Sequence, residues 1–187
     1  GLVRVHSVHQ LPTYVPANLS GHRSAVKAVF FDASDKTIYA VCRNGAVSVW
    51  ELRKRPDVEP AEVQTAKDEV RESGRSGIGE DHIGTWWELT TRHFLEKAHA
   101  KVTSAVLHGP SRLLVIGFNT GVFALYEMPS CNEVHTLSVS DGRIDATAIS
   151  PGGEWLAFGC AQLGQLLVWE WQAETYVLKQ QGHFFAE

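Results

Sequence analysis

The stretch from Ile144 to Trp171, IDATAISPGGEWLAFGCAQLGQLLVWEW, contains three short apolar runs separated by two turns. The first run alternates apolar and polar residues from Ile144 and ends at the Ser-Pro-Gly-Gly sequence of 150–153. The second begins at Trp155, and the third follows a glycine-bounded turn at 159–164 and ends at Trp169. Apolar runs bounded by Gly and Pro are signals of strands joined by turns. The stretch therefore predicts three consecutive strands.

The same unit occurs twice upstream, beginning at Val26 and at Val102. Its spacing is regular: Phe31 and Leu107 are 76 positions apart and Leu107 and Ile149 are 42 apart, while Trp50 and Tyr126 are 76 apart and Tyr126 and Trp169 are 43 apart. The basic period is therefore 42 to 43 residues, and the first interval carries 34 more. A period of about 40–45 residues with four strands per repeat is typical of a propeller blade.

Six positions recur in the same register: a histidine before each innermost strand and an aromatic residue before a glutamate at the end of each third strand. They are His22, His99, His183, Trp50, Tyr126 and Trp169. They resemble the Gly-His and Trp-Asp marks of WD repeats, where the histidine is expected to hydrogen-bond to strand residues and the aromatic side chain to pack between blades. The predicted fold is all-β: a partial WD-repeat β-propeller with about three complete four-stranded blades and fragments of two others.

The repeats leave incomplete units at both ends of the 187 residues. Leu2–His6 is predicted as the third strand of a preceding blade, and Tyr14–Leu19 as its outer strand. At the other end, Tyr176–Leu178 begins an outer strand, and Gly182-His183 announces one more innermost strand. Propellers close with typically 4–8 blades. Residues 1–187 are therefore predicted to form an arc of one propeller, with unpaired apolar faces on its first and last blades.

Residues 53–84 interrupt the pattern between the first and second complete units. They hold six basic and eight acidic residues and no aromatic residue. Such a composition cannot bury enough apolar surface to order itself. The segment is predicted to be a charged, disordered insertion. The order of strands in a meander places it on the face away from His22 and His99.

Composition limits the classes of function. The formal net charge is −4, which argues against an overall electrostatic grip on nucleic acid. The sequence contains no apolar run of about 18 residues or more, so no membrane span is predicted. The three cysteines, Cys42, Cys131 and Cys160, lack CxxC spacing, which favours a reducing compartment and no metal site.

No pattern of residues predicts catalysis. The histidines lack metal-ligand spacing, Asp145 and Glu154 suit turn or solvent contacts better than acid–base chemistry, and no helix follows the 159–164 loop to cradle a phosphate. We therefore predict no enzyme, no metal and no cofactor. Possible contacts to a partner protein or RNA are the basic cluster Arg53-Lys54-Arg55, although a solvated loop edge is favoured, and whichever of Trp86 and Trp87 does not pack on its blade.

The last repeat carries a more specific resemblance. The segment 153–184, GEWLAFGCAQLGQLLVWEWQAETYVLKQQGHF, is similar to the periodic tryptophan protein 2 family, as are Leu114–Phe118 and Leu125–Pro129. Asn44-Gly45 and Asn119-Thr120-Gly121 replace the Asp-Gly of regular repeats, so the usual His–Ser–Trp–Asp hydrogen-bond network is degenerate. The family resemblance covers roughly 20–184, in the first of two tandem propellers.

This resemblance implies a non-catalytic scaffold of ribosome biogenesis, in the nucleus and nucleolus. It implies membership of the UTP-B subcomplex of the small-subunit processome, a snoRNP needed for 18S pre-rRNA processing and 40S assembly. The implied partners are other UTP-B proteins, with pre-rRNA or snoRNA in the same assembly, and neither a membrane nor a small-molecule substrate. The repeat alone also allows a peptide-recognising adaptor, such as a substrate receptor for ubiquitin ligation or a vesicle-coat subunit.

Overall fold

A computed structural model describes residues 1–6, 16–54, 85–95 and 99–182, and within them the chain is built of antiparallel strands. Those strands are β1 (Val3–Val5), β2 (Ala17–Leu19), β3 (Val26–Phe31), β4 (Thr37–Cys42), β5 (Ala46–Lys54), β6 (Thr85–Phe94), β7 (Val102–His108), β8 (Leu113–Phe118), β9 (Val122–Glu127), β10 (Asn132–Ser138), β11 (Ala146–Ile149), β12 (Trp155–Cys160), β13 (Gln165–Glu170) and β14 (Thr175–Gln181). A short 3-10 turn, η2 (Ala161–Leu163), joins β12 to β13.

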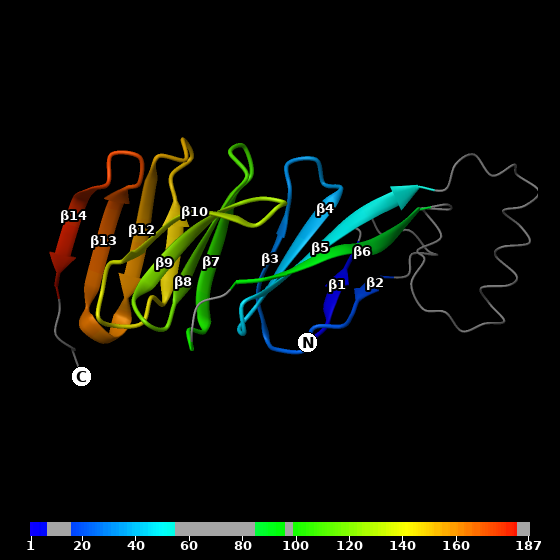
Figure 1. Ribbon diagram of the computed structural model, residues 1–187, viewed down its shortest axis with the longest axis horizontal. Helices are drawn as coiled ribbons and strands as arrows, with labels where there is room; N and C mark the ends of the chain where they lie inside the picture. The colour runs from blue at the N-terminus through cyan, green and yellow to red at the C-terminus, as the bar shows by residue number, and fades with distance from the viewer. Residues whose placement is uncertain (7–15, 55–84, 96–98, 183–187) are drawn as a thin grey trace, which may run out of the picture.

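The strands form one two-stranded and three four-stranded sheets, each made of strands consecutive in the sequence. We name them sheet I (β1–β2), sheet II (β3–β6), sheet III (β7–β10) and sheet IV (β11–β14). They stand side by side along the long axis of the molecule (Figure 1). The predicted partial propeller with three complete blades is confirmed. Within the described residues no helix is long and apolar enough to cross a membrane.

Apolar layers between neighbouring sheets make up the core. Sheets I and II enclose Leu19, Ile38 and Trp50. Larger layers lie between sheets II and III, around Val41 and Tyr126, and between sheets III and IV. Strand β8 is buried along its whole length because it has a neighbouring sheet on each side. A strand covered on both faces is read in the sequence as a continuous apolar run rather than an alternating one.

One face of sheet IV is open. Leu156, Phe158 and Leu167 are fully buried against sheet III, whereas Trp155 and Leu166, on the other face, are 50% and 45% exposed. The predicted unpaired apolar face is therefore confirmed for the last blade.

The loops define two surfaces of the stack. The surface that we call the histidine face carries the loops before β3, β7 and β11 and those joining β4–β5, β8–β9 and β12–β13. The opposite surface, the insertion face, carries the other loops, and Lys54 pairs with Thr85 there. These faces lie at the bottom and top of Figure 1. Lys54 and Thr85, which flank the predicted insertion, therefore lie on the face away from His22. Residues 55–84 themselves are outside the described residues.

Several strands differ from the sequence predictions in their bounds, and one strand was not predicted at all. Strand β5 continues through Arg53 and Lys54, which pair with Trp86 and Thr85, so these two residues are not part of an insertion loop. Strand β11 begins at Ala146 rather than Ile144, because the Ile144 backbone hydrogen-bonds to sheet III. The outer strand β10 was not predicted, because most of its residues are polar and one of its faces is exposed.

Candidate partner-binding surfaces

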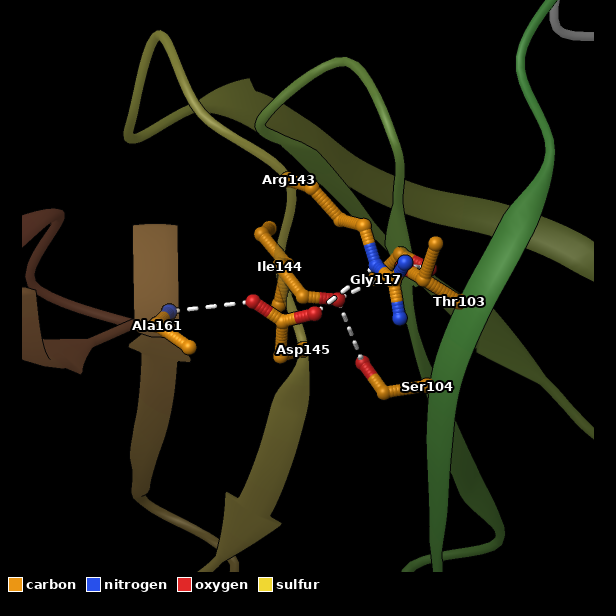
Figure 2. Close-up of polar contacts among 7 residues, drawn as sticks. All are labelled: Thr103, Ser104, Gly117, Arg143, Ile144, Asp145 and Ala161. Atoms are coloured by element: carbon orange, nitrogen blue, oxygen red, sulfur yellow. Dashed lines mark hydrogen bonds and ion pairs between the residues drawn. The ribbon is translucent and has the colours of Figure 1, made fainter. Parts of the chain in front are cut away.

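The seam between sheets III and IV is closed on the histidine face by hydrogen bonds from side chains to the backbone (Figure 2). The Thr103 hydroxyl lies 2.6 Å from the Ile144 carbonyl oxygen, and the Ser104 hydroxyl donates to the same oxygen at 3.3 Å. The Ile144 N–H donates to the Phe118 carbonyl at 3.2 Å. Both backbone polar groups of Ile144 are therefore satisfied across the seam, as burial of Ile144 requires.

Asp145, the residue after Ile144, makes two further polar contacts next to this seam (Figure 2). Its carboxylate accepts the Ala161 N–H at 3.0 Å and pairs with the Arg143 Nε at 2.7 Å. Asp145, whose position in the sequence suits turn contacts better than acid–base chemistry, thus holds the loop before β11 to the start of η2. Its contacts are those of a structural anchor.

The insertion-face end of the same seam is closed by His108. Its Nε2 lies 2.9 Å from the Pro151 carbonyl oxygen, and its Nδ1 lies 2.6 Å from the Ser111 hydroxyl. Because a carbonyl only accepts, Nε2 carries the proton, and the Ser111 hydroxyl donates to Nδ1. Sequence reasoning did not single out His108, because it lies at the end of a strand and outside the repeat-equivalent histidine positions.

The repeat-equivalent positions have different surroundings in each sheet. His22 and Trp50 are buried, with ring centroids 6.5 Å apart, and His22 Nδ1 lies 3.7 Å from the Cys42 sulfur. His99 is exposed in a turn with φ of 60°. His183 lies outside the described residues. The histidines at repeat-equivalent positions therefore do not share one common contact.

The aromatic positions fill the layers between and beside strands. Tyr126 is buried, and its hydroxyl donates to Glu133 at 3.4 Å. Burial first, and then the neighbouring Glu133 carboxylate, raise the pKa of the Tyr126 phenol far above its ordinary value. Trp169 is buried and makes an edge contact with Tyr176 at 4.5 Å between ring centroids. These aromatics act as packing residues.

The residues of the predicted contact cluster on the insertion face have different surroundings in the structure. Trp87 packs on the layer between sheets I and II and meets Phe31 edge-on, whereas Trp86 is 36% exposed. Arg53 pairs with Glu51 at 2.9 Å and with Glu88 at 3.0 Å. The charge of Arg53 is thus balanced by two carboxylates. Arg55 lies outside the described residues.

Charge is distributed unequally between the two faces. The described parts of the histidine-face loops, which leave out 96–98, carry the basic residues Arg23, Arg43, Lys101 and Arg143 and the acidic residues Asp141 and Asp145, of which Asp145 pairs with Arg143. The insertion face carries mainly acidic side chains, with Lys36, Arg53 and Arg112 among them: Asp32, Asp35, Glu51, Glu88, Glu127, Glu154, Glu170 and Glu174. The net charge of −4 therefore conceals a basic surface around Arg23, Arg43 and Lys101.

A groove opens in that basic surface on the side of sheet II that faces sheet I. It has a volume of about 410 Å³ and is lined, among others, by His22, Arg23, Asn44, Arg92 and Phe94. Phe94 is 64% exposed. This combination of cationic, amide and aromatic groups is suited to binding a ligand.

The described residues offer no set of three or more His, Cys, Asp or Glu side chains placed to hold a metal ion. Cys42, Cys131 and Cys160 are free thiols. Burial raises the pKa of the Cys131 thiol to about 11, so this thiol is mostly protonated at neutral pH and is a poor nucleophile.

Comparison with known proteins places these features in a family. Residues 14–51 match the WD domain, G-beta repeat model. Periodic tryptophan protein 2 homologues are 43% identical in Neurospora crassa, over 97% of this chain, and 39% identical in Schizosaccharomyces pombe, over 98%. The Saccharomyces cerevisiae periodic tryptophan protein 2 is 41% identical over 88% of the chain. The chain spans 17–20% of the length of these three relatives.

Two solved structures share the fold. A crystal structure of RRP9 WD40 repeats superposes with a TM-score of 0.61 over 88% of this chain and 41% of that one, at 15% identity. A structure of U3-55K gives a TM-score of 0.58 over 88% of this chain and 42% of that one, at 16% identity. Together with the sequence relatives, the stacked four-stranded sheets show that this chain is a WD40-repeat homologue of a segment of the periodic tryptophan protein 2 family.

Proposed function

We propose that this chain is part of a non-catalytic scaffold of ribosome biogenesis, acting in the small-subunit processome in 18S pre-rRNA processing and 40S assembly. The observation that carries the proposal is the 43% identity to a periodic tryptophan protein 2 homologue over 97% of this chain. The chain matches only a fifth of such proteins, so the proposal concerns the role of this segment within the larger molecule.

The geometry supports a scaffold rather than an enzyme. Polar side chains such as Thr103 and His108 are occupied in joining sheets III and IV, and Asp145 anchors the loop before β11 to η2. The seam between sheets III and IV, closed at both faces, holds these two sheets in fixed relative positions, and a rigid stack presents wide loop surfaces to several partners at once. The proposed partners are UTP-B proteins, with pre-rRNA or snoRNA in the same assembly, and the proposed location is the nucleolus.

The Trp86 side chain is the part of the predicted insertion-face cluster that fits a partner contact. It is exposed, while Trp87 beside it is packed and Arg53 is paired with carboxylates. We therefore assign the contact on this face to Trp86. Aromatic residues are over-represented among residues that contribute strongly to protein interfaces.

Affinity purification of the tagged parent protein tests the assignment. We expect UTP-B proteins and pre-rRNA to co-purify, and depletion of the protein to cause uncleaved 18S precursors to accumulate. Recovery of a cullin adaptor or of coat proteins, with normal 18S maturation, would instead establish the second candidate, a peptide-recognising adaptor. The groove on the histidine face is the observation that favours this second candidate.

A further inference from the structure

The groove on the histidine face is assembled from segments that are distant in the sequence. The loop before β3 contributes His22 and Arg23, the β4–β5 turn contributes Asn44, and the end of β6 contributes Arg92 and Phe94. Strand pairing sets Arg92 opposite Ser48 and Phe94 opposite Ala46, so both side chains lie on the same face of sheet II as the groove. The volume of about 410 Å³ is in the range of small-ligand pockets.

The Arg92 guanidinium is held in place at one wall of the groove. Its Nε donates to the Ser48 hydroxyl at 3.3 Å, and one of its terminal nitrogens lies close to Gly21. Burial, followed by the charge of Arg92, lowers the pKa of His22. The His22 imidazole is therefore neutral at pH 7, and the fixed charges lining the groove are the guanidinium groups of Arg92 and Arg23.

Two further cations lie just outside the groove. Arg43 and Lys101 are exposed, and their loops are adjacent because the Arg43 N–H donates to the Ala25 carbonyl at 2.8 Å while its carbonyl accepts the Val102 N–H at 2.9 Å. The described loops 20–25, 43–45 and 99–101 contain no acidic residue. An anionic ligand at this surface therefore meets no carboxylate from these loops.

The groove also has an apolar part. Phe94 is the most exposed large hydrophobic side chain among the described residues, at 64%, and Ala46 and Cys42 line the groove beside it. A fully hydrated anion would not contact these apolar side chains. A ligand that carries an apolar side chain between negative charges satisfies both parts, because arginine clusters recognise acidic motifs and an apolar side chain fills the pocket.

We propose that this groove is a docking site for an acidic peptide segment of a partner protein, with one apolar side chain against Phe94 and carboxylates on Arg23, Arg92 and Arg43. Charge complementarity with the surrounding basic loops argues for this occupant. RNA is disfavoured as the occupant because the net charge of these 187 residues is −4 and their insertion face is acidic, so a long polyanion would be attracted by the histidine face alone. The inference goes beyond the proposed function and does not depend on which assembly contains the chain.

Fluorescence polarisation with the full chain tests the site. The probe is a short fluorescein-labelled peptide of glutamates and aspartates around a central phenylalanine, and the comparison ligands are the same peptide with the phenylalanine replaced by serine and a fluorescein-labelled oligouridine. We expect the phenylalanine peptide to bind most tightly, and its affinity to fall as the salt concentration is raised.

Variants assign the binding to the groove. Arg23→Glu and Phe94→Ala are each expected to weaken the phenylalanine peptide about tenfold or more, because both side chains are exposed contacts of the ligand. Lys36→Glu, on the insertion face, and Val134→Ala, on β10, are matched controls that are expected to leave the affinity unchanged. Far-UV circular dichroism and the denaturation midpoint verify that each variant is folded.

Three results would overturn the proposal. The first is the absence of peptide binding at millimolar concentration. The second is peptide binding that neither Arg23→Glu nor Phe94→Ala weakens. The third is tighter binding of oligouridine than of the peptide, with loss of that binding in Arg23→Glu, which would assign the surface to RNA. None of these results bears on co-purification with processome proteins, so the two proposals fail separately.

Discussion

His22 and Trp50 lie beside each other in the layer between sheets I and II, with ring centroids 6.5 Å apart. Both His22 Nε2 and Trp50 Nε1 are buried, and neither has a hydrogen-bond partner among the residues that the structure describes. Ala40 lies on the same face of β4 as Cys42, which contacts His22, and belongs to the same apolar cluster as Trp50. Ala40 is completely buried, so a serine at this position would place a hydroxyl inside the cluster that contains Trp50.

Ala40→Ser is expected to stabilise the chain by about 1 kcal/mol, because a hydroxyl can accept from the Trp50 indole and donate to the His22 imidazole. Urea denaturation measures the free energy of unfolding. The gain is expected to shrink in the Trp50→Phe background, which has no indole N–H. Destabilisation by Ala40→Ser in the otherwise native chain would show that position 40 does not reach the two rings.

Thr103→Val is expected to destabilise the chain by about 1–2 kcal/mol, because the substitution keeps the shape but removes the hydroxyl that bonds to Ile144. Ser104→Ala removes a longer bond to the same oxygen and is expected to cost less. Both are measured by urea denaturation. Equal costs, or a cost of zero for Thr103→Val, would contradict the role of Thr103 at the seam.

Gly121→Ala is expected to cost about 3 kcal/mol or more. Gly121 has a φ of 75°, and a Cβ there would overlap the Ser140 carbonyl oxygen, which is backbone and cannot move aside locally. Gly152→Ala is the matched control, because its Cβ would meet only the Glu154 side chain, at 3.7 Å, and it is expected to change stability by less than about 0.5 kcal/mol. Thermal denaturation of both variants gives the comparison.

The Cys131 thiol is expected to make the fold less stable at alkaline pH. Its folded pKa is raised to about 11 by burial, above the ordinary value, so the unfolded chain releases this proton first. Its contribution to stability is therefore complete below the unfolded pKa of about 8.5 and is lost as the pH rises from there toward 11. Cys131→Ala is expected to flatten the decline of the urea midpoint over this range. An unchanged slope would show that the thiol is not protected in the folded state.

The open face of sheet IV is expected to make the isolated chain self-associate, because Trp155, Leu166 and Leu178 expose apolar surface on one side of it. Sedimentation velocity over a range of concentrations should reveal this, and Trp155→Glu should shift the chain toward monomer. Val134→Glu, on β10, is the matched control and should not. A native chain that stays monomeric at high concentration would contradict the prediction.

The sequence by itself determined the repeating unit. Gly and Pro turns at a period of 42–43 residues fix the strands, since these turns depend on backbone conformations that few other residues adopt. Continuous apolar runs such as Leu113–Phe118 are typical of strands covered on both faces, and the structure shows β8 to be one. Polar outer strands such as β10 gave no comparable signal, because a strand that is exposed on one face needs no apolar pattern.

Only the tertiary structure decided which residues meet. Arg23, Asn44 and Phe94 line one groove although long intervals of sequence separate them, and the net charge gives no sign that basic residues gather on one face. The same holds for the bond from Thr103 to Ile144, which joins two sheets. Period and turn chemistry are local properties, whereas the relative placement of loops depends on how neighbouring sheets stack, which no single segment of the chain encodes.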